Sequence, residues 1–368
     1  MNSDRLKRLQ ELMEKHEFEI VALNPGATLY YLTGVSFHLM ERPVVLFVQQ
    51  NGPSSIVLPE LEEVRLADSD LDTQIFSYDE NPSSQEEAFR KASKFLGSGA
   101  VHIAVEPLRL RYFELEIMQR LVAEWVISSG EEALAELRLV KGSDEVELME
   151  TATTIAEAAV QETLPHVHVG MTEHEIASLL TINLLRTGSE PELPFNPIVA
   201  SGLNSALPHA TPTDRKLEQG DLLLLDWGAR HGGYISDLTR TYALGKVEDE
   251  LEEIHSAVLR ANEAGRGAIA PGMSCSKVDK AARSVIDAAG YGDHFIHRTG
   301  HGIGLETHEP PYIREDNERT LTKGMTFTVE PGIYLPQKGG VRIEDDIIVT
   351  EDGGRSLSTL PRELMVIR

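Results

Sequence analysis

The chain has 368 residues, of which 41% are hydrophobic and 25% are charged, a globular composition that excludes fibrous and disordered proteins. Its 34 basic and 59 acidic residues give a formal net charge of −25. A field of that sign repels phosphate backbones and anionic lipid, so we expect no nucleic acid and no membrane as partners.

The amino-terminal segment predicts a charged helix with a stripe formed by Leu6, Leu9 and Met13. It does not resemble an apolar signal segment, and the single cysteine, Cys275, has no internal disulfide partner, so we expect a cytoplasmic protein. Every apolar run is far shorter than the roughly 20 residues needed to cross a bilayer.

Residues 1–140 alternate between helical patterns and apolar strands, which predicts a small α/β domain. The predicted strands are Ile20 to Leu23, Val44 to Val48, Ser55 to Leu58 and Val101 to Val105. No glycine-rich phosphate motif follows any of them, so a nucleotide site there has no support.

The pattern changes at Lys141, where we place the domain boundary, and Ser143 is the expected cap of a long helix. Residues 141–368 contain a divergent repeat with a period of about 100 residues. Helix starts recur at Thr172 and Ser274, with Thr172 and Glu175 in capping-box spacing. We therefore predict an α+β domain with pseudo-two-fold symmetry.

Acidic residues coincide when the two halves of the repeat are superposed. Asp226 matches Glu330 at an offset of 104, and Asp237 matches Glu344 at an offset of 107. A hairpin that places Gly228 opposite Gly233 would bring Asp226 and Asp237 onto one sheet face. Any one of these acids alone is compatible with a solvated or salt-bridged carboxylate. Together they predict groups that either share a proton or hold metal.

Histidines are concentrated in the glycine-rich segment from His297 to Glu309. Its glycines allow the backbone to approach a site closely, which makes His301 a candidate ligand flanked by His297 and His308. His209 is the counterpart of His308 in the first half. One histidine and four carboxylates suit two divalent ions, with manganese or cobalt favoured over a thiolate-type zinc site. No serine-hydrolase motif is present.

Four segments resemble the pita-bread metallopeptidases, in particular the Xaa-Pro peptidases aminopeptidase P and prolidase. The resemblance covers Lys141 to Arg368, and the preceding region is similar to the amino-terminal domain shared with creatinase. The matching segments are Asp226 to Gly228 with Asp237 to Thr241, Gly300 to Gly304, Glu330 to Tyr334, and Gly340 to Asp345.

The resemblance implies a pita-bread catalytic domain, residues 141–368, behind an α/β domain, residues 1–140, that serves substrate access and dimerisation. It implies two metal ions, Mn²⁺ first with Co²⁺ or Zn²⁺ as alternatives, a homodimer, and short proline-containing peptides as substrates. The implied metal ligands are Asp226, Asp237, His301, Glu330 and Glu344. The implied substrate and catalytic residues are His209, His297, His308, Glu330 and Arg342, with Arg342 supporting Glu344 and Tyr334 close to the metals.

Four readings of the function remain open at this level. We place a Xaa-Pro peptidase of aminopeptidase P type first and a strict Xaa-Pro dipeptidase (prolidase) second. The reason is Tyr312, which stands where the resemblance to many prolidases leads us to expect an arginine that binds the substrate carboxylate. Arg298, Arg314 or a partner subunit's arginine are the alternative cations. A catalytically silent peptide-binding relative, or non-peptide hydrolysis as in creatinase, is disfavoured by the intact ligand set.

Overall fold

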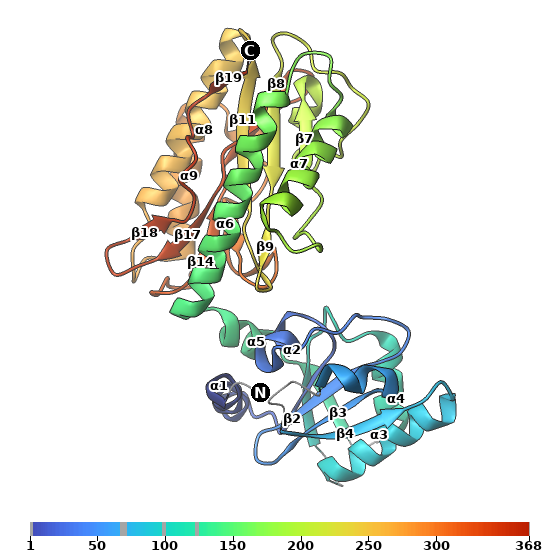
Figure 1. Cartoon of the computed structure of the whole chain (residues 1–368). Helices are drawn as coiled ribbons and strands as arrows, with labels where there is room; N and C mark the ends of the chain where they lie inside the picture. The colour runs from blue at the N-terminus through green and yellow to red at the C-terminus, as the bar shows by residue number, and fades with distance from the viewer. Residues whose placement is uncertain (1–2, 67–71, 98–100, 122–124, 368) are drawn as a thin grey trace. The chain divides into compact units, whose positions relative to one another are not determined.

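The computed structural model describes residues 3–66, 72–97, 101–121 and 125–367. The chain divides into two compact units, Met1–Arg138 and Leu139–Arg368. The division falls at the end of a short helix, immediately before the segment that opens the second unit (Figure 1).

The first unit is a mixed sheet flanked by helices. Its strand order is β4-β3-β2-β1-β5-β6, with β1, β5 and β6 mutually parallel and β2 antiparallel to both of its neighbours. The predicted strands are confirmed as β1, β2, β3 and β5, and their apolar side chains form one core with α3 and α4. The elements are α1 (Ser3–Lys15), β1 (Ile20–Leu23), α2 (Ala27–Thr33), β2 (Val45–Gln49), β3 (Ser54–Pro59), η1 (Glu60–Leu66), β4 (Thr73–Tyr78), α3 (Pro82–Leu96), β5 (Val101–Val105), α4 (Tyr112–Leu121), β6 (Trp125–Ser129) and α5 (Glu131–Arg138).

The second unit contains two similar halves, each made of a helix pair and a set of strands. The first half comprises α6 (Ser143–Thr163), η2 (Leu164–His166), α7 (Glu173–Thr187), β7 (Ile198–Ser201), η3 (Gly202–Ala206), β8 (Leu222–Trp227), β9 (Arg230–His231), β10 (Tyr234–Ile235) and β11 (Leu238–Leu244). The second half comprises α8 (Asp249–Gly267), α9 (Cys275–Ala288), η4 (Gly292–His294), β12 (Gly300–Gly302), β13 (Glu309–Ile313), β14 (Thr326–Val329), β15 (Gly332–Leu335), β16 (Gly339–Arg342), β17 (Asp345–Val349), β18 (Gly354–Ser356) and β19 (Met365–Ile367).

The helix pairs cover the two larger sheets of this unit, whose strand orders are β19-β11-β8-β7 and β13-β12-β14-β17-β18. Helices α6 and α7 pack on β7, β8 and β11, while α8 and α9 pack on the strands of the second half (Figure 1). The capping box at Thr172 and Glu175 is present at the start of α7. The N-cap of helix α6 is Gly142, not Ser143 as we predicted, and the N–H of Gly142 donates a hydrogen bond to the side chain of Glu145. The pseudo-two-fold α+β arrangement is thus confirmed.

The hairpin between β8 and β11 differs in register from our prediction. The turn lies at Gly232 and Gly233, both with positive φ, so Asp226 pairs with Thr239 and not with Ile235. Two consecutive residues with positive φ form the tight turn that suits hairpins, so the residue opposite Asp226 lies four positions further along the chain than predicted. Asp237 remains diagonal to Asp226, because the shift is an even number of residues.

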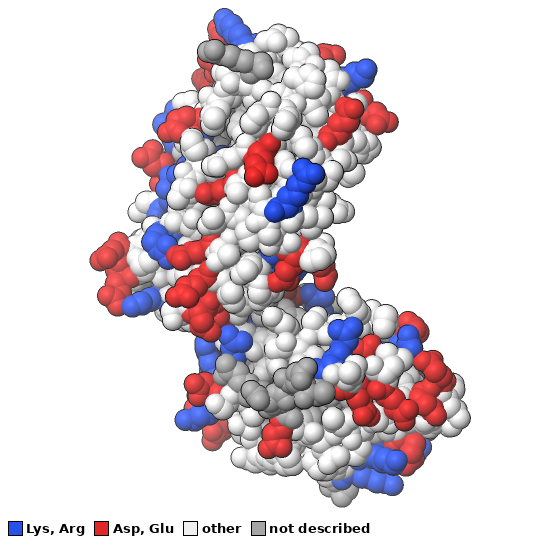
Figure 2. Space-filling view, viewed as in Figure 1, with Lys and Arg blue, Asp and Glu red and all other residues white. Residues whose placement is uncertain are grey.

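On the face shown in Figure 2, acidic side chains cover more of the surface than basic ones, in agreement with the net charge. Within the described residues, no helix combines the length and the apolarity that a membrane crossing requires.

Candidate metal centre and active site

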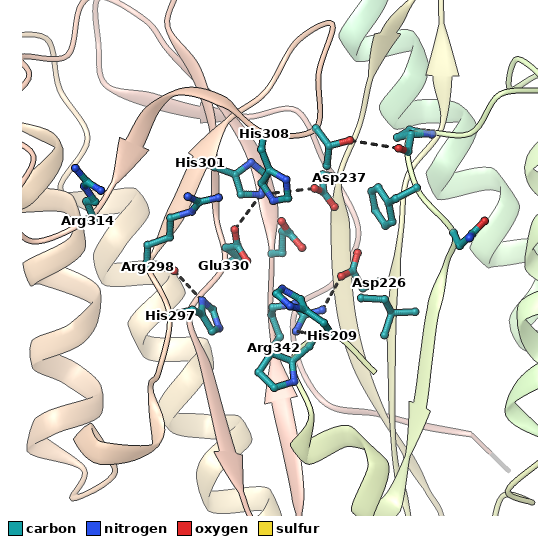
Figure 3. A pocket seen from close by; sticks show the side chains of 17 residues that line it. His209, Asp226, Asp237, His297, Arg298, His301, His308, Arg314, Glu330 and Arg342 are labelled. Atoms are coloured by element: carbon teal, nitrogen blue, oxygen red, sulfur yellow. Dashed lines mark hydrogen bonds and ion pairs between the residues drawn. The ribbon is translucent and has the colours of Figure 1, made fainter. Parts of the chain in front are cut away.

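Five predicted ligand residues converge where the two halves of the second unit meet (Figure 3). Their positions follow from the strands: Asp226 lies on β8, Asp237 precedes β11, His301 lies on β12, Glu330 follows β14 and Glu344 precedes β17. An antiparallel bridge between Thr239 and Glu344 joins the halves. The repeat therefore places its matching acids on either side of one centre.

The tightest part of the cluster consists of Asp237, His301 and Glu344. Each of them offers one ligand atom, and these atoms all lie within 4.8 Å of one another. Nε2 of His301 lies 3.8 Å from Oδ2 of Asp237 and 3.1 Å from Oε1 of Glu330. Such spacing is compatible with a shared cation.

Burial and mutual repulsion of the carboxylates shift the pKa values in the cluster. Burial and the neighbouring carboxylates, Glu344 foremost, raise the pKa of Asp237 well above its ordinary value. Burial likewise raises the pKa of Asp226, and burial with the charge of Glu330 raises that of Glu344. For Glu330, burial is outweighed by the hydrogen bond and charge of His301, which lower its pKa to about 2.

These residues fit divalent cations. Oδ1 of Asp226 is buried and has no hydrogen-bond partner among the described residues. Buried ionised carboxylates without compensation are costly, and cations remove both the desolvation penalty and the mutual repulsion. Four carboxylates and one imidazole form a hard donor set that suits such ions.

The guanidinium of Arg342 donates hydrogen bonds to the cluster and to a neighbouring loop. Its guanidinium donates to Oδ2 of Asp226 at 2.6 Å and to Oγ1 of Thr239 at 3.1 Å. The resemblance implied that Arg342 supports Glu344, and the positive charge of Arg342 does oppose the rise in the pKa of Glu344. Glu344 also accepts a hydrogen bond at 2.5 Å from the Thr239 hydroxyl to which Arg342 donates. Arg342 also donates to the carbonyl of Pro208, which precedes His209. It therefore orients one ligand and one loop of the substrate site.

Tyr334 connects this arginine to His297. Its hydroxyl lies 2.9 Å from Nη1 of Arg342 and 2.9 Å from Nε2 of His297. Burial raises the pKa of Tyr334 to about 12, so its hydroxyl stays protonated at neutral pH. Tyr334 thus lies near the cluster without offering a charged ligand.

A cavity of about 820 Å³ opens onto the ligand cluster. His209, His297 and His308 all line it, in agreement with their expected place. The ring of His308 lies edge-on to that of His301, with centroids 4.1 Å apart. Burial, with His301 and Arg298 nearby, lowers the pKa of His308 to about 4, so its imidazole is neutral at neutral pH.

The cavity contains both arginines that the sequence offered as alternative cations, together with wall residues that the sequence analysis did not single out. Arg298 and Arg314 line it, and the guanidinium carbon of Arg298 lies 4.6 Å from the centroid of the Tyr312 ring. Other walls come from Pro194, Phe195, Asn196, Ile198 and Thr307. The segment before β7 carries no motif, and its only signal is three prolines that mark a loop.

Comparisons with known proteins agree with this geometry. Residues 147–351 match the model of metallopeptidase family M24, and residues 5–140 match the creatinase/prolidase N-terminal domain. The chain is similar to the Xaa-Pro dipeptidase of Pyrococcus furiosus, with 34% identity over 366 residues that cover 98% of this chain and 99% of that protein.

Solved structures show the same architecture. A prolidase from Thermococcus sibiricus is similar at a TM-score of 0.94 and 32% identity, covering 100% of this chain and 99% of that one. An X-Pro aminopeptidase from Thermotoga maritima MSB8 is similar at a TM-score of 0.86 and 31% identity, covering 98% of this chain and 99% of that one. With its ligand cluster and both matching domains, the chain belongs to metallopeptidase family M24 and is a metal-dependent hydrolase of the pita-bread fold.

Proposed function

We propose that this chain is a Xaa-Pro dipeptidase that hydrolyses the bond between an amino-terminal residue and a carboxy-terminal proline. The names of similar proteins favour this activity over the aminopeptidase P type that we placed first from the sequence. Aminopeptidase P activity on longer peptides is the second candidate, supported by the likeness to the X-Pro aminopeptidase.

The observation that carries the proposal is the presence of arginine in the cavity that adjoins the ligand cluster. A dipeptide ends in a carboxylate close to the scissile bond, and arginine is the side chain best suited to bind it. Tyr312 does not supply this cation, but Arg298 and Arg314 both line the same cavity. Arg298 contacts the Tyr312 ring, which restricts its guanidinium.

Asp226, Asp237, His301, Glu330 and Glu344 would hold two divalent cations, and we propose Mn²⁺ because oxygen donors predominate. When bound, these ions supply Lewis-acid polarisation of the scissile carbonyl and acidify water.

The chain's own groups then divide the remaining work. Glu330 accepts the proton of the attacking water and passes it to the prolyl nitrogen. His308, neutral at neutral pH, donates its ring N–H to the carbonyl oxygen as negative charge develops there. His209 and His297 line the cavity and hold the substrate, while Arg342 keeps Asp226 and the His209 loop in place.

We further propose that the amino-terminal α/β domain, residues 1–140, contributes to substrate access and dimerisation. Light scattering of the purified chain tests the dimer: twice the chain mass of 40.7 kDa supports it, and a monomeric mass contradicts it.

The activity is tested by hydrolysis of Gly-Pro and Gly-Pro-Gly-Gly with metal-stripped protein, with and without Mn²⁺. Metal-dependent cleavage of Gly-Pro alone supports the dipeptidase, and cleavage of both supports the second candidate. Asp226→Asn is the control, because it removes a carboxylate while retaining the size of the side chain. No cleavage by protein shown to hold two metals per chain would reject both, and would favour a silent peptide-binding relative.

A further inference from the structure

A buried ion pair lies beneath the loop that carries His308. Nζ of Lys141 is 2.6 Å from Oε1 of Glu309, and the two side chains are 2% and 3% exposed. They are 168 residues apart in the sequence. Neither residue lines the cavity, so this pair has no part in the chemistry described above.

Glu309 directly follows a short loop that connects β12, the strand of His301, to β13. Strands β12 and β13 are paired, with Gly302 opposite Glu309, and the register shifts between His301 and Gly302. Residues 303–308 therefore form a loop between two fixed points, with His308 as its last residue. The close approach of the backbones requires glycine, because a Cβ at Gly302 would overlap the carbonyl of Glu309.

The side chains of the pair also reach the middle of this loop. A Cβ at Gly304 would lie 2.8 Å from Oε1 of Glu309 and 2.8 Å from Cε of Lys141. The carbonyl of Gly304 accepts a hydrogen bond from the N–H of Ile235, two residues before Asp237. The backbone of Lys141 is itself held, because its N–H donates to the carbonyl of Gly324 at 2.8 Å. The pair therefore packs against both the middle and the end of the loop.

We infer that Lys141 is a positioning residue for turnover, which acts through Glu309 to hold the His308 ring against His301. This inference rests on the proposed function in one respect, the role of His308 in catalysis. A buried ion pair is weak evidence of net stabilisation, since apolar replacement of both partners is often neutral. Its better-supported value is a defined geometry, which is what a loop bearing a functional histidine needs.

The test compares Lys141→Met in two backgrounds, the wild-type chain and His308→Ala, both as metal-loaded enzyme. In the wild-type background we expect kcat for Gly-Pro to fall about 10- to 100-fold, with KM changed by less than about 3-fold. In the His308→Ala background the same substitution should lower kcat by less than about 2-fold, because the histidine through which it acts is absent.

Two controls separate positioning from loss of stability. Val258→Ala removes buried volume from α8, so it should lower Tm while kcat stays within about 2-fold of wild type. Lys323→Met removes an exposed ion pair of the same 2.6 Å length and should change neither quantity. An equal loss of kcat on Lys141→Met in both backgrounds would show that the pair acts on stability alone and would overturn the inference.

A crystal structure of Lys141→Met gives a readout independent of activity. Displacement of the His308 ring from its 4.1 Å separation to His301 supports the inference, and an unchanged ring with a normal loop overturns it. If the wild-type enzyme fails to cleave Xaa-Pro peptides, the proposed function fails, and the ring position decides the positioning role by itself.

Discussion

Replacement of Arg298 by alanine should distinguish a dipeptidase from an enzyme that accepts longer peptides. Arg298 lines the cavity and contacts the Tyr312 ring, and no hydrogen bond or ion pair within the described residues engages its guanidinium. Arg314 lines the same cavity, but its side chain is 56% exposed and lies 2.8 Å from Asp316. Arg298 is therefore the better placed of the two to bind a substrate carboxylate.

The expected magnitude follows from the lost interaction. A hydrogen bond to a charged group contributes about 1.5 to 3 kcal/mol, which corresponds to roughly a 10- to 100-fold loss of kcat/KM. Arg314→Ala removes an exposed, already paired charge, so its effect should stay below about 5-fold.

The assay compares kcat/KM for Gly-Pro with that for Gly-Pro amide, which lacks the carboxylate. Arg298→Ala should reduce kcat/KM for Gly-Pro roughly 10- to 100-fold and leave kcat/KM for Gly-Pro amide within about 3-fold of wild type. Equal losses on both substrates would show that Arg298 holds the fold or the metals and not the carboxylate. A larger effect of Arg314→Ala would assign the role to Arg314 instead.

Two further predictions concern stability and geometry. His255 is buried on α8, and its Nε2 has no hydrogen-bond partner among the described residues. Burial lowers its pKa from 6.5 to about 4. Between these two values the unfolded chain binds a proton that the folded chain does not, so the fold loses stability as the pH falls from 6.5 towards 4. His255→Leu should remove this effect, about 2 kcal/mol at pH 5 and none above pH 7, and equal urea midpoint shifts at pH 5 and pH 7 would contradict it. Gly228→Ala should lower both Tm and activity, because its Cβ would overlap the carbonyl of Ser236 beside Asp237, whereas Gly267→Ala, which has open space, should leave both unchanged.

The local features of the fold were predictable because they depend on neighbouring residues. Apolar runs predicted four strands of the first unit, and the spacing of Thr172 and Glu175 predicted the start of α7. The hairpin register was not predictable from the glycines alone, since Gly228 and Gly233 also permit a turn. Only the left-handed backbone at Gly232 and Gly233 places Thr239 opposite Asp226.

The candidate site likewise contains features that the sequence predicts and features that it does not. Its acids were predictable because the repeat aligned them, and alignment of two halves is a property of the sequence. Arg342 was expected to support Glu344, and its long side chain also reaches across to donate a hydrogen bond to Asp226. The Lys141–Glu309 pair had no signal at all, because it joins residues 168 positions apart and Lys141 served only to mark the domain boundary.

The division of the site between strands and loops explains how specificity can vary while the metal centre stays fixed. All five proposed ligand residues lie on strands or within one residue of a strand end, where pairing fixes the backbone. The two arginines lie outside the strands, Arg298 before β12 and Arg314 directly after β13. Substitution in these connecting segments changes the walls of the cavity without moving a ligand. We therefore expect peptide-length selection in this chain to respond to changes at Arg298 while its capacity to bind metal is retained, which metal analysis of Arg298→Ala will test directly.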